Sequence, residues 1–410
     1  MSYFHRNECR VCKKGDLTRI LSLGEHPPVD NFIEAGKEQE EMRYPLDVYF
    51  CNTCSLVQLL DIVEENELFH GEYAYFSSSS KPLVDHFSKY ADDLKKRHTL
   101  KSDDLLVDIG SNDGVLLQFF TDTCRVLGIE PSANVADIAR EKGIETLDGF
   151  FTEKMAKDIV EKHGQAKIIT ANNVFAHIDD LDEIVRGVKV LLSDDGVFVT
   201  ESHYLLDLIE HMEFDTVYHE HLCYYSVKPL CYLFERFDME VSAVERVATH
   251  GGSIRVFARK KMGKPIESSV AELLSLEEQA GIHSLSRFVD FQKDAEALRD
   301  KLVSVVRGFR KEGKKVTAYG APAKGNTLLN FCGFTGDDIA YVTDTTPYKI
   351  GRLTPGSHIP VVSPDILKTE TPDHILLLAW NYRDFILDKE TELRKRGAQF
   401  IIPIPKVEIV

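Results

Sequence analysis

The feature that most constrains this chain is an apolar run that ends in an acidic, glycine-rich turn, at residues 103–114. The run Leu105-Leu106-Val107 has the composition of a strand buried on both faces, and a helix is expected to begin near Val115. The turn between them has the pattern D-x-G-x-x-D-G and contains Asp108, Gly110, Asn112, Asp113 and Gly114. A strand, a glycine turn and a helix in this order predict a nucleotide-binding α/β unit.

Apolar runs that alternate with helical periodicity surround this unit. Strands are expected at 126–130, 145–147, 167–170 and 196–201, and helices at 84–98 and 132–142. This alternation predicts an α/β fold with a doubly wound parallel sheet, whose ligand lies beyond the carboxyl ends of the strands.

Polar residues at these strand ends indicate which nucleotide binds. The dinucleotide fingerprint G-x-G-x-x-G is absent, and an acidic residue at the start of the turn would repel a pyrophosphate but suits a cationic ammonium. One carboxylate is placed to accept from ribose hydroxyls and another from an adenine amino group, with an aromatic ring against the base. These residues are Glu130, Asp148, and Phe150 or Phe151, with Asn172 and Asn173 at the next strand end. They predict S-adenosylmethionine as the cofactor, with NAD or another nucleotide as the alternative.

Two cysteine pairs, Cys9-x2-Cys12 and Cys51-x2-Cys54, are separated by 38 residues. Each pair can form a tight turn that directs two thiolates at one point, and two such turns supply the four soft ligands of tetrahedral Zn²⁺. A site closed by four thiolates has no open position for catalysis, so a structural zinc is predicted, and a redox pair is the alternative. The remaining cysteines lack ligand spacing and are expected to be buried apolar residues: Cys124, Cys223, Cys231 and Cys332.

A dense run of titratable groups, Tyr218-His219-Glu220-His221, follows the fifth strand. Imidazole titrates near neutrality, so it can take up a proton and return it, and a neighbouring carboxylate can fix its tautomer. His177 and Tyr75 are expected to converge on the same edge of the sheet. A buried structural cluster is one alternative. A metal site at His219 and His221 is another, although H-E-H lacks the H-E-x-x-H spacing.

The last part of the chain predicts a second Rossmann-like sheet. Residues 268–311 are expected to be largely helical, with strands at 315–319, 339–343 and 373–379. Backbone N–H groups and a lysine at a helix start form an anion site, so the loops of this sheet suit a diphosphate, with an ordinary packing domain as the alternative. The candidate substrate residues here are Gly320, Ala321, Lys324, Asn326, Asp344, Lys349, Arg352, Asn381 and Tyr382.

Length, charge and hydropathy exclude several classes of protein. A chain of 410 residues exceeds one hydrophobic core and is expected to form two or three domains. Its net charge of −17 argues against a nucleic-acid partner, and no apolar run suits a membrane span or a secretory signal, so a cytoplasmic protein is expected. The charge is −21 over residues 1–300 and +4 over residues 301–410. That split reflects either chance on solvated faces or an anionic ligand on the last domain.

Together these features resemble the three-domain sugar C-methyltransferases that act on nucleotide-linked 4-keto-deoxysugars. The motifs that carry the resemblance extend over nearly the whole chain. They are the four paired cysteines, Pro27-Pro28-Val29-Asp30-Asn31-Phe32, Tyr75-Phe76-Ser77-Ser78, the turn at 108–114, Tyr218-His219-Glu220-His221, His250-Gly251-Gly252-Ser253 and Tyr319-Gly320-Ala321-x-x-Lys324-Gly325-Asn326.

The resemblance implies a zinc-binding domain at 1–70, a class I methyltransferase domain at 71–264 and a Rossmann-like sugar-nucleotide-binding domain at 265–410. It also implies S-adenosylmethionine-dependent methylation at C3 of a nucleotide-linked 4-keto-6-deoxysugar, for branched deoxysugar biosynthesis. His221 would remove the C3 proton to give an enolate, which takes up the methyl group in line.

The same resemblance implies roles for the neighbours of this base. Glu220 or Tyr218 would orient His221, while Tyr75 and His177 would hold sugar hydroxyls or the enolate oxygen. Zinc takes no part in the chemistry. The expected substrate contacts in this region are Tyr75, Ser77 and Ser78.

Two alternatives stay open on the sequence alone. An O- or N-methyltransferase would need a base near a hydroxyl or an amine, and would not exchange the C3 proton. A zinc-ribbon scaffold with a degenerate methyltransferase domain would bind without catalysis, although the intact turn at 108–114 and Glu130 argue against it. The sequence does not determine the nucleotide, the C2 and C3 substituents or the oligomeric state, and it is compatible with a monomer.

Overall fold

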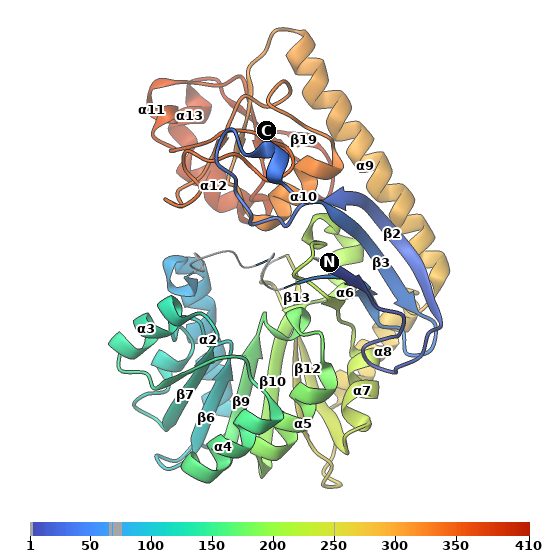
Figure 1. The fold of residues 1–410 in the computed structure, drawn as a ribbon, viewed down its shortest axis with the longest axis vertical. Helices are drawn as coiled ribbons and strands as arrows, with labels where there is room; N and C mark the ends of the chain where they lie inside the picture. The colour runs from blue at the N-terminus through green and yellow to red at the C-terminus, as the bar shows by residue number, and fades with distance from the viewer. Residues whose placement is uncertain (1–2, 65–67, 69–75, 250) are drawn as a thin grey trace.

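The structure is a computed structural model that describes residues 3–64, 68, 76–249 and 251–410. Its larger sheets are a seven-stranded sheet in the middle of the chain, a four-stranded N-terminal sheet and a six-stranded C-terminal sheet. In Figure 1 the middle sheet lies at the bottom and the C-terminal region at the top, with the N-terminal strands and the long helix α9 (Leu285–Lys311) along one side.

The seven-stranded sheet confirms the predicted doubly wound arrangement. Its strands are β6 (Leu105–Ile109), β7 (Arg125–Glu130), β8 (Thr146–Asp148), β9 (Ala166–Asn172), β10 (Leu192–His203), β12 (Met239–Val247) and β13 (Ser253–Lys260). The order is β8–β7–β6–β9–β10–β13–β12, and the five strands from β8 to β10 are parallel. β13 runs antiparallel to both of its neighbours, so the sheet is mixed at one edge, as doubly wound sheets often are.

Helices cover both faces of this sheet because its central strands are apolar on both sides. They are α2 (Lys81–Arg97), α3 (Ala133–Glu141), α4 (Glu153–His163) and α5 (Leu181–Leu191), followed by α6 (Leu205–Glu210) and α7 (Val227–Glu235). Leu105 and Val107 of β6 belong to the buried cluster that contains α4 and α5, whereas Leu106 belongs to the cluster that contains α2. The alternation along β6 thus matches the two covered faces.

One predicted helix is wrong. Instead of an α-helix from Val115, the chain forms only a 3₁₀ turn, η3 (Leu117–Phe119). Val115, Leu116 and Leu117 are all buried. These side chains pack with those of α2 in one buried cluster, so tertiary packing rather than helical periodicity shapes this segment.

The N-terminal region contributes two small antiparallel sheets. Its strands are β1 (Tyr3–His5), β2 (Leu17–His26), β3 (Tyr44–Cys51), β4 (Val57–Leu59) and β5 (Asp61–Val63), with a short 3₁₀ turn η1 (Glu38–Glu40). β1 pairs with β5, and the larger sheet has the order β11–β4–β3–β2. Its edge strand β11 (Cys223–Tyr224) comes from the middle of the chain and begins two residues after His221. The titratable run at 218–221 is therefore tied to the N-terminal sheet.

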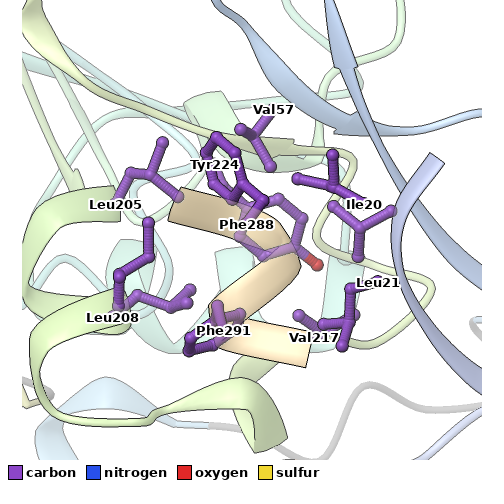
Figure 2. A pocket seen from close by; sticks show the side chains of 11 residues that line it. Ile20, Leu21, Val57, Leu205, Leu208, Val217, Tyr224, Phe288 and Phe291 are labelled. Carbon is purple, nitrogen blue, oxygen red and sulfur yellow. The ribbon is translucent and has the colours of Figure 1, made fainter. Parts of the chain in front are cut away.

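Apolar side chains join this N-terminal sheet to α6 and α9 around a small apolar pocket (Figure 2). The lining residues are Ile20, Leu21, Val48, Val57, Leu205, Leu208, Ile209, Val217, Tyr224, Phe288 and Phe291. One buried cluster continues from here through a face of the middle sheet and into the C-terminal sheet. The three regions therefore share a hydrophobic core.

The C-terminal sheet confirms the second predicted Rossmann-like unit. Its strands are β14 (Val316–Tyr319), β15 (Val342–Thr343), β16 (Val361–Val362), β17 (His374–Leu377), β18 (Gln399–Ile402) and β19 (Glu408–Ile409), in the order β16–β15–β14–β17–β18–β19. All pairs are parallel except β18 with β19. The helices are α10 (Ala323–Phe331), α11 (Ile366–Thr369), α12 (Arg383–Lys389) and α13 (Thr391–Lys395).

Residues 268–311 are helical as predicted, but they form two helices, α8 (Ser268–Gln279) and α9. The chain turns between them at Gly281, whose φ of +70° lies in the region that favours glycine. The domain boundaries after residues 70 and 264 stay a prediction. None of the described helices is long and apolar enough to cross a membrane.

Candidate active site

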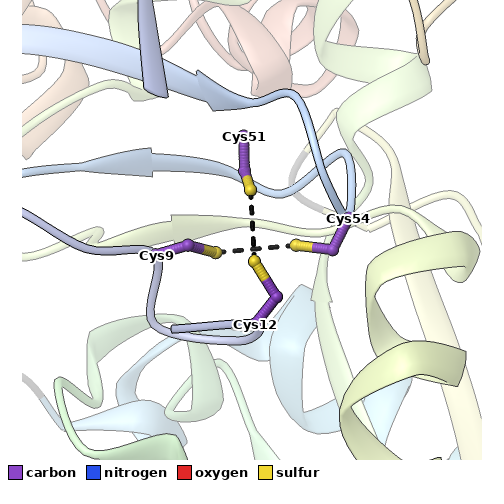
Figure 3. Close-up of side chains that lie close together, drawn as sticks. All are labelled: Cys9, Cys12, Cys51 and Cys54. Carbon is purple, nitrogen blue, oxygen red and sulfur yellow. Dashed lines mark hydrogen bonds between the residues drawn. The ribbon is translucent and has the colours of Figure 1, made fainter. Parts of the chain in front are cut away.

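Four cysteines converge in the N-terminal region, as the sequence predicts (Figure 3). Cys9 and Cys12 lie in the turn before β2, whereas Cys51 ends β3 and Cys54 lies in the turn that follows it. The Sγ atoms of Cys9 and Cys54 are 3.5 Å apart, and those of Cys12 and Cys51 are 3.4 Å apart. All four thiols are buried, none forms a disulfide, and their sulfurs lie within 4.8 Å of one another.

These separations fit a tetrahedral Zn²⁺ ion, since zinc–sulfur bonds of about 2.3 Å place the sulfurs about 3.8 Å apart. Burial and neighbouring thiols raise the pKa of Cys12 to about 12, so the thiolate form needs a cation to stabilise it. Four protein ligands leave no open position, which makes the site structural. Within the described part of the chain, no second group of three or more ligand side chains is placed to hold a metal, so the alternative at His219 and His221 gains no support.

Glycine is required at two positions of the turn after β6. Gly110 has a φ of +67°, and a Cβ there would lie 2.4 Å from Cγ2 of Val174. Gly114 has a φ of +77°, and its Cβ would lie 2.4 Å from Cδ1 of Ile144. Val174 belongs to the loop after β9 that also carries His177. The turn at 108–114 is therefore packed directly against the loop of a predicted catalytic residue.

Glu130, at the end of β7, is held by two backbone donors. Its Oε2 accepts from the N–H of Asn112 at 3.0 Å, and its Oε1 accepts from the N–H of Ser132 at 2.9 Å. Burial nevertheless raises the pKa of Glu130. A carboxylate fixed in this way keeps lone pairs for two further donors, which matches the predicted contact with ribose hydroxyls.

The two aspartates of the turn are also buried. Oδ1 of Asp108 accepts from Oγ1 of Thr170 at 2.6 Å, and burial raises the pKa of Asp108 to about 7. Asp113 accepts from the hydroxyl of Ser78 and pairs with Lys142 at 3.0 Å. A cationic ligand beside Asp108 would favour its ionised form, as the predicted ammonium contact requires.

Ser77 and Ser78 lie on the cofactor turn, although the sequence places them with the substrate. They belong to the 3₁₀ turn η2 (Ser77–Ser79), which precedes α2. The N–H of Ser77 donates to Oδ1 of Asn112 at 2.8 Å. Tyr75, the third residue predicted from this motif, lies outside the described residues.

The three residues predicted to contact adenine differ in whether their side chains are free to bind it. Asp148 ends β8 beside Glu130, but its Oδ1 pairs with Arg140 at 2.6 Å. Phe151 is buried in the core, where its ring packs against Gly187 of α5. The ring of Phe150 is 58% exposed. Of the two aromatic candidates, Phe150 thus has the free ring face.

The strongest indication of a bound polar ligand is Asn172, at the end of β9. Both its amide oxygen and its amide nitrogen are buried, and neither has a partner among the described residues. The next residue, Asn173, has a φ of +55° and donates its N–H to the carbonyl of Glu201 at 2.7 Å. A buried amide without partners, at the strand end where such sheets bind ligands, fits a polar group of the predicted cofactor.

His221 is held by hydrogen bonds at both ring nitrogens. Nδ1 lies 2.8 Å from the carbonyl oxygen of Thr216 in η5 (Phe214–Thr216), and Nε2 lies 2.8 Å from the hydroxyl of Tyr218. A carbonyl can only accept, so Nδ1 carries a proton, and in the neutral imidazole Nε2 holds the lone pair. The nitrogen of His221 that can act as a base therefore faces a phenol.

Two further histidines surround His221. The ring centroid of His177, in η4 (Phe175–His177), lies 4.9 Å from that of His221, and the ring of His203, at the end of β10, lies 5.1 Å away. Burial lowers the pKa of His177 to about 4, so it is neutral at pH 7. The sequence predicts His177 but misses His203, although both follow strands that end at the same edge of the sheet.

The other two members of the run behave differently from His221. His219 is fully buried and packs edge-on against Tyr44 of β3, with a centroid distance of 5.9 Å. Burial raises the pKa of Glu220 to about 8, and the charge of Asp30 acts in the same direction. Glu220 is thus a neutral acid at pH 7, able to donate a hydrogen bond rather than to raise the basicity of His221.

The predicted substrate loops of the C-terminal sheet lie together at the ends of β14 and β15. Asp344 accepts from the N–H groups of Ala321 and Thr346 at 2.7 and 2.8 Å. Lys349 donates to the carbonyl of Ala321 at 2.9 Å. Gly320 has a φ of +79°, which favours glycine there. Asp344 and Lys349 therefore brace this loop, and Asn381 and Tyr382 lie in η6 (Trp380–Tyr382), just after β17.

Three predicted substrate residues contact the Pro27–Phe32 segment. Asn326 is buried, and its Nδ2 donates to the carbonyl of Val29 at 2.7 Å. Arg352 donates to the carbonyl of Phe32 at 3.2 Å, and Nζ of Lys349 lies 4.9 Å from the Phe32 ring. This N-terminal segment is therefore part of the same site as the C-terminal loops.

Lys324 faces a buried acidic group that the sequence does not reveal. Its Nζ lies 4.0 Å from the ring of Trp380, and Trp380 Nε1 donates to Oδ2 of Asp215 at 2.7 Å. Burial lowers the pKa of Lys324, and the charges of Asp215 and Glu213 oppose that change. Because η5 also supplies the carbonyl that holds His221, Lys324 lies close to the histidine cluster. Neither Asp215 nor Trp380 stands in a motif, so no pattern identifies them.

Three family models match successive parts of the chain. The family model of a methyltransferase domain matches residues 84–244, that of a C-methyltransferase C-terminal domain matches residues 248–405, and that of a zinc binding domain matches residues 9–69. C-methyltransferase NovU from Streptomyces niveus is 38% identical over 409 residues, covering 98% of this chain and 97% of NovU.

Solved methyltransferase structures also align with part of the chain. A SAM-dependent methyltransferase from Anabaena variabilis is 16% identical, with a TM-score of 0.34 over 42% of this chain and 84% of its own. An S-adenosylmethionine-dependent methyltransferase from Clostridium acetobutylicum is 11% identical, with a TM-score of 0.35 over 44% of this chain and 92% of its own.

Proposed function

Because the chain belongs to the family of S-adenosylmethionine-dependent C-methyltransferases, we propose that its methyl acceptor is C3 of a nucleotide-linked 4-keto-6-deoxysugar. The family confirms the predicted enzyme class, the class I methyltransferase fold of the middle sheet, and both cofactors, S-adenosylmethionine and structural zinc. Membership of this family also argues against the alternative of a non-catalytic zinc-ribbon scaffold. The product would serve the biosynthesis of branched deoxysugars.

A methyl group transferred to carbon needs a carbon nucleophile. A C–H beside a ketone is acidic because its carbanion delocalises into an enolate, so a keto group at C4 activates C3 once a base removes the proton. The observation that carries this proposal is the geometry of His221. The Nδ1 bond to Thr216 leaves Nε2 as the nitrogen that can act as a base, in a ring flanked by two other histidines. That is the arrangement a general base requires at neutral pH.

The enolate oxygen needs hydrogen-bond donors as its charge develops. His177 is neutral at pH 7 and lies beside His221. Its single N–H would have to turn from the backbone of Asn173 and Glu220 to donate to the enolate oxygen. Glu220 holds its proton at pH 7 and can donate an O–H. Neutral donors avoid placing a second negative charge beside the enolate. Tyr75, which lies outside the described residues, is proposed as a further donor from the segment before η2.

The residues proposed to hold S-adenosylmethionine are those at the carboxyl ends of the parallel strands. When bound, the cofactor supplies the methyl group as an electrophile on a sulfonium. Asp108 and Asp113 supply negative charge, Glu130 supplies acceptors, and the Asn172 amide supplies one donor and one acceptor. The loop of Asn172 continues into His177, so cofactor binding and acid–base chemistry share one segment.

The sugar nucleotide is proposed to bind where the C-terminal loops meet the Pro27–Phe32 segment. Positive charge there comes from Lys349, Arg352 and Lys324. Residues 301–410 also have a net charge of +4, whereas residues 1–300 have a net charge of −21. This supports a diphosphate as the anionic group. The domain division at residues 70 and 264 is proposed on the same grounds, with the zinc region at 1–70 completing the wall of the site.

His221→Asn tests the proposed base. A panel of nucleotide 4-keto-6-deoxysugars is incubated with wild type and variant in deuterated water, and methyl position and deuterium content are read by NMR. We expect wild type to exchange the C3 proton and to methylate C3, and the variant to lose both by at least about 100-fold. Undiminished exchange in the variant would show that another group removes the proton. Methylation at C5, at oxygen or at nitrogen would overturn the C3 assignment.

A further inference from the structure

Two arginines of the N-terminal region bind one aspartate of the loop that carries His177. Nη1 of Arg6 donates to both carboxylate oxygens of Asp179, at 2.9 and 2.8 Å, and Nε of Arg10 donates to Oδ1 at 3.0 Å. Asp179 stands two residues after His177. Three charged hydrogen bonds therefore fix the end of this loop to the N-terminal region.

Arg10 has little freedom to leave this position. It lies between Cys9 and Cys12, inside the first zinc-binding turn, and its side chain is 0% exposed. Its guanidinium also donates to Oε1 of Gln58 at 3.1 Å and to the carbonyl of Leu59. The fold of the zinc-binding turn thus determines where the guanidinium points.

Strand β4 connects the same arginine to His221. Leu59, whose carbonyl accepts from Arg10, donates its own N–H to the carbonyl of Leu222 at 3.0 Å. Leu222 directly follows His221, and the next residue, Cys223, pairs with Gln58 across β11 and β4. The Arg10 guanidinium therefore contacts Asp179, two residues after His177, and Leu59 of β4. β4 in turn pairs with β11, which begins two residues after His221.

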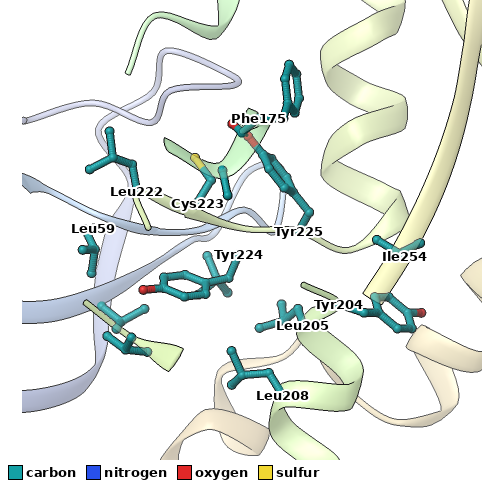
Figure 4. Close-up of a cluster of buried hydrophobic side chains, with 14 of the residues drawn as sticks. Leu59, Phe175, Tyr204, Leu205, Leu208, Leu222, Cys223, Tyr224, Tyr225 and Ile254 are labelled. Carbon is teal, nitrogen blue, oxygen red and sulfur yellow. The ribbon is translucent and has the colours of Figure 1, made fainter. Parts of the chain in front are cut away.

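The loop of His177 is fixed at its other end as well. The hydroxyl of Tyr225 donates to the carbonyl of Phe175 at 3.0 Å, and the N–H of His177 donates to the carbonyl of Val174 at 2.9 Å. Figure 4 shows Phe175 and Tyr225 next to Leu222 and Cys223 in the buried cluster. The Asp179 contacts are therefore one of the constraints on where the His177 ring lies relative to His221, together with the hydrogen bonds of that ring to the backbone of Asn173 and Glu220.

We infer that Asp179 and Arg10 are positioning residues for methyl transfer: they join the first zinc-binding turn to the His177 loop and so set His177 against His221. The inference rests on the proposed function in one respect, that His177 and His221 act on the acceptor. Zinc then contributes to catalysis indirectly, because the ion holds the turn in which Arg10 lies.

Simple stabilisation by an ion pair would have a different signature. Arg10 is fully buried although Asp179 is 36% exposed, so removal of the carboxylate also leaves a buried guanidinium with fewer partners and is expected to lower stability. A fall in stability alone is therefore no evidence of positioning. Arg19 and Asp47 form a more exposed pair that joins β2 to β3 at 3.0 Å. Asp47→Asn serves as the control for the loss of a charged pair in the N-terminal region.

The test compares Asp179→Ala, Asp179→Asn and Asp47→Asn with wild type, each as the full chain with zinc. For each variant we would measure bound zinc, S-adenosylmethionine affinity, kcat, KM and the imidazole ¹H–¹⁵N signals. The signals of His177 and His221 are assigned with the variants His177→Gln and His221→Asn. We expect Asp179→Ala to keep its zinc and its cofactor affinity within about twofold, and to lose kcat by roughly 10- to 100-fold with little change in KM. The imidazole signals of His177 and His221 should shift in Asp179→Ala and stay in place in Asp47→Asn. Asp179→Asn keeps an acceptor oxygen, so its kcat and its imidazole signals should change less than those of Asp179→Ala.

The inference is overturned if Asp179→Ala retains kcat within about twofold, if only its melting temperature falls, or if its histidine signals stay in place. Should the alanine variant fold poorly, Arg6→Ala, which removes two of the three hydrogen bonds to Asp179, decides the question by the same criteria. The imidazole signals do not involve the acceptor, so they report on positioning even if wild type shows no C3 exchange. A failure of the proposed function is thereby distinguished from a failure of this inference.

Discussion

The hydroxyl of Tyr218 lies 2.8 Å from Nε2 of His221, while Nδ1 of the same ring is 2.8 Å from the carbonyl of Thr216. The carbonyl of Thr216 places a proton on Nδ1, which fixes the tautomer of the neutral imidazole. Nε2, the nitrogen that can act as a base, is the one that Tyr218 contacts. The substrate proton can therefore reach Nε2 in two ways: the phenol moves aside, or the phenol itself passes the proton on.

Tyr218→Phe separates these two possibilities. The Nδ1 bond to Thr216 still fixes the tautomer, so we expect C3 exchange to stay measurable. Loss of the Tyr218 contact leaves the ring less well oriented, so kcat should fall by about 10- to 100-fold. Initial rates and deuterium incorporation with the same sugar nucleotide check this. A loss as complete as that of His221→Asn would indicate that the phenol itself transfers the proton.

Glu220→Gln should change the pH dependence of both activity and stability. The folded-state pKa of about 8 lies above the ordinary value, so the folded protein holds a proton that the unfolded chain releases between about pH 4.5 and 8. Stability from this group therefore falls as the pH rises through that window. Glutamine does not titrate, so the variant should gain melting temperature relative to wild type more at pH 8 than at pH 5.

For activity, we expect wild type to decline above about pH 8 as Glu220 loses its proton. The amide of Glu220→Gln can still donate a hydrogen bond, so the variant should retain turnover without that decline. Profiles of kcat against pH from 6 to 9.5 provide the measurement. Glu161→Gln, on the exposed side of α4, is the control and should leave both profiles unchanged. An identical alkaline decline in the Glu220 variant would assign it to a different group.

Gly110→Ala should weaken S-adenosylmethionine binding through Val174. The added Cβ would lie 2.4 Å from Cγ2 of Val174 and push the loop that contains Asn172. We expect a loss of affinity of about tenfold or more in calorimetric titration. Gly143→Ala is a matched control, since Gly143 has a similar φ of +82° with nothing within 4 Å of its Cβ. Equal losses in both variants would attribute the effect to backbone strain alone.

Cys51→Ser should abolish zinc binding and lower stability. Cys51 ends β3 and supplies one of four buried ligands, and structural zinc sites contribute folding free energy directly. Elemental analysis should give one zinc per chain for wild type and much less for the variant, with a lower melting temperature that excess chelator reproduces in wild type. Cys231→Ser, outside the cluster, should keep its zinc. Full metal content in Cys51→Ser would exclude the proposed ligand set.

Much of the fold follows from local pattern. The strands β6 to β10 are apolar runs bounded by polar turns, and the cysteine pairs have the spacing of a metal site, so both are predicted. The helix expected from Val115 does not form because this segment packs into the buried cluster with α2, and local periodicity does not show which faces neighbours will cover. His221 and its neighbours are found because they form a dense run in the chain.

Contacts between distant segments are what the sequence could not supply. Asp179 meets Arg6 and Arg10 across more than 160 residues, and Trp380 meets Asp215 across 165. Each of these residues is unremarkable within its own segment. The pairing of Asp148 with Arg140 and the burial of Phe151 likewise depend on how elements pack, which a strand-end rule does not specify.

The pairing of β11 with β4 bears on how such enzymes can be recombined. The segment that begins two residues after His221 completes a sheet whose other strands come from the first 60 residues of the chain. A chimaera that exchanges the zinc region alone would pair a foreign β4 with a native β11, next to His221. The smallest unit that keeps this sheet intact in an exchange is therefore discontinuous: the zinc region together with the stretch that contains His221 and β11.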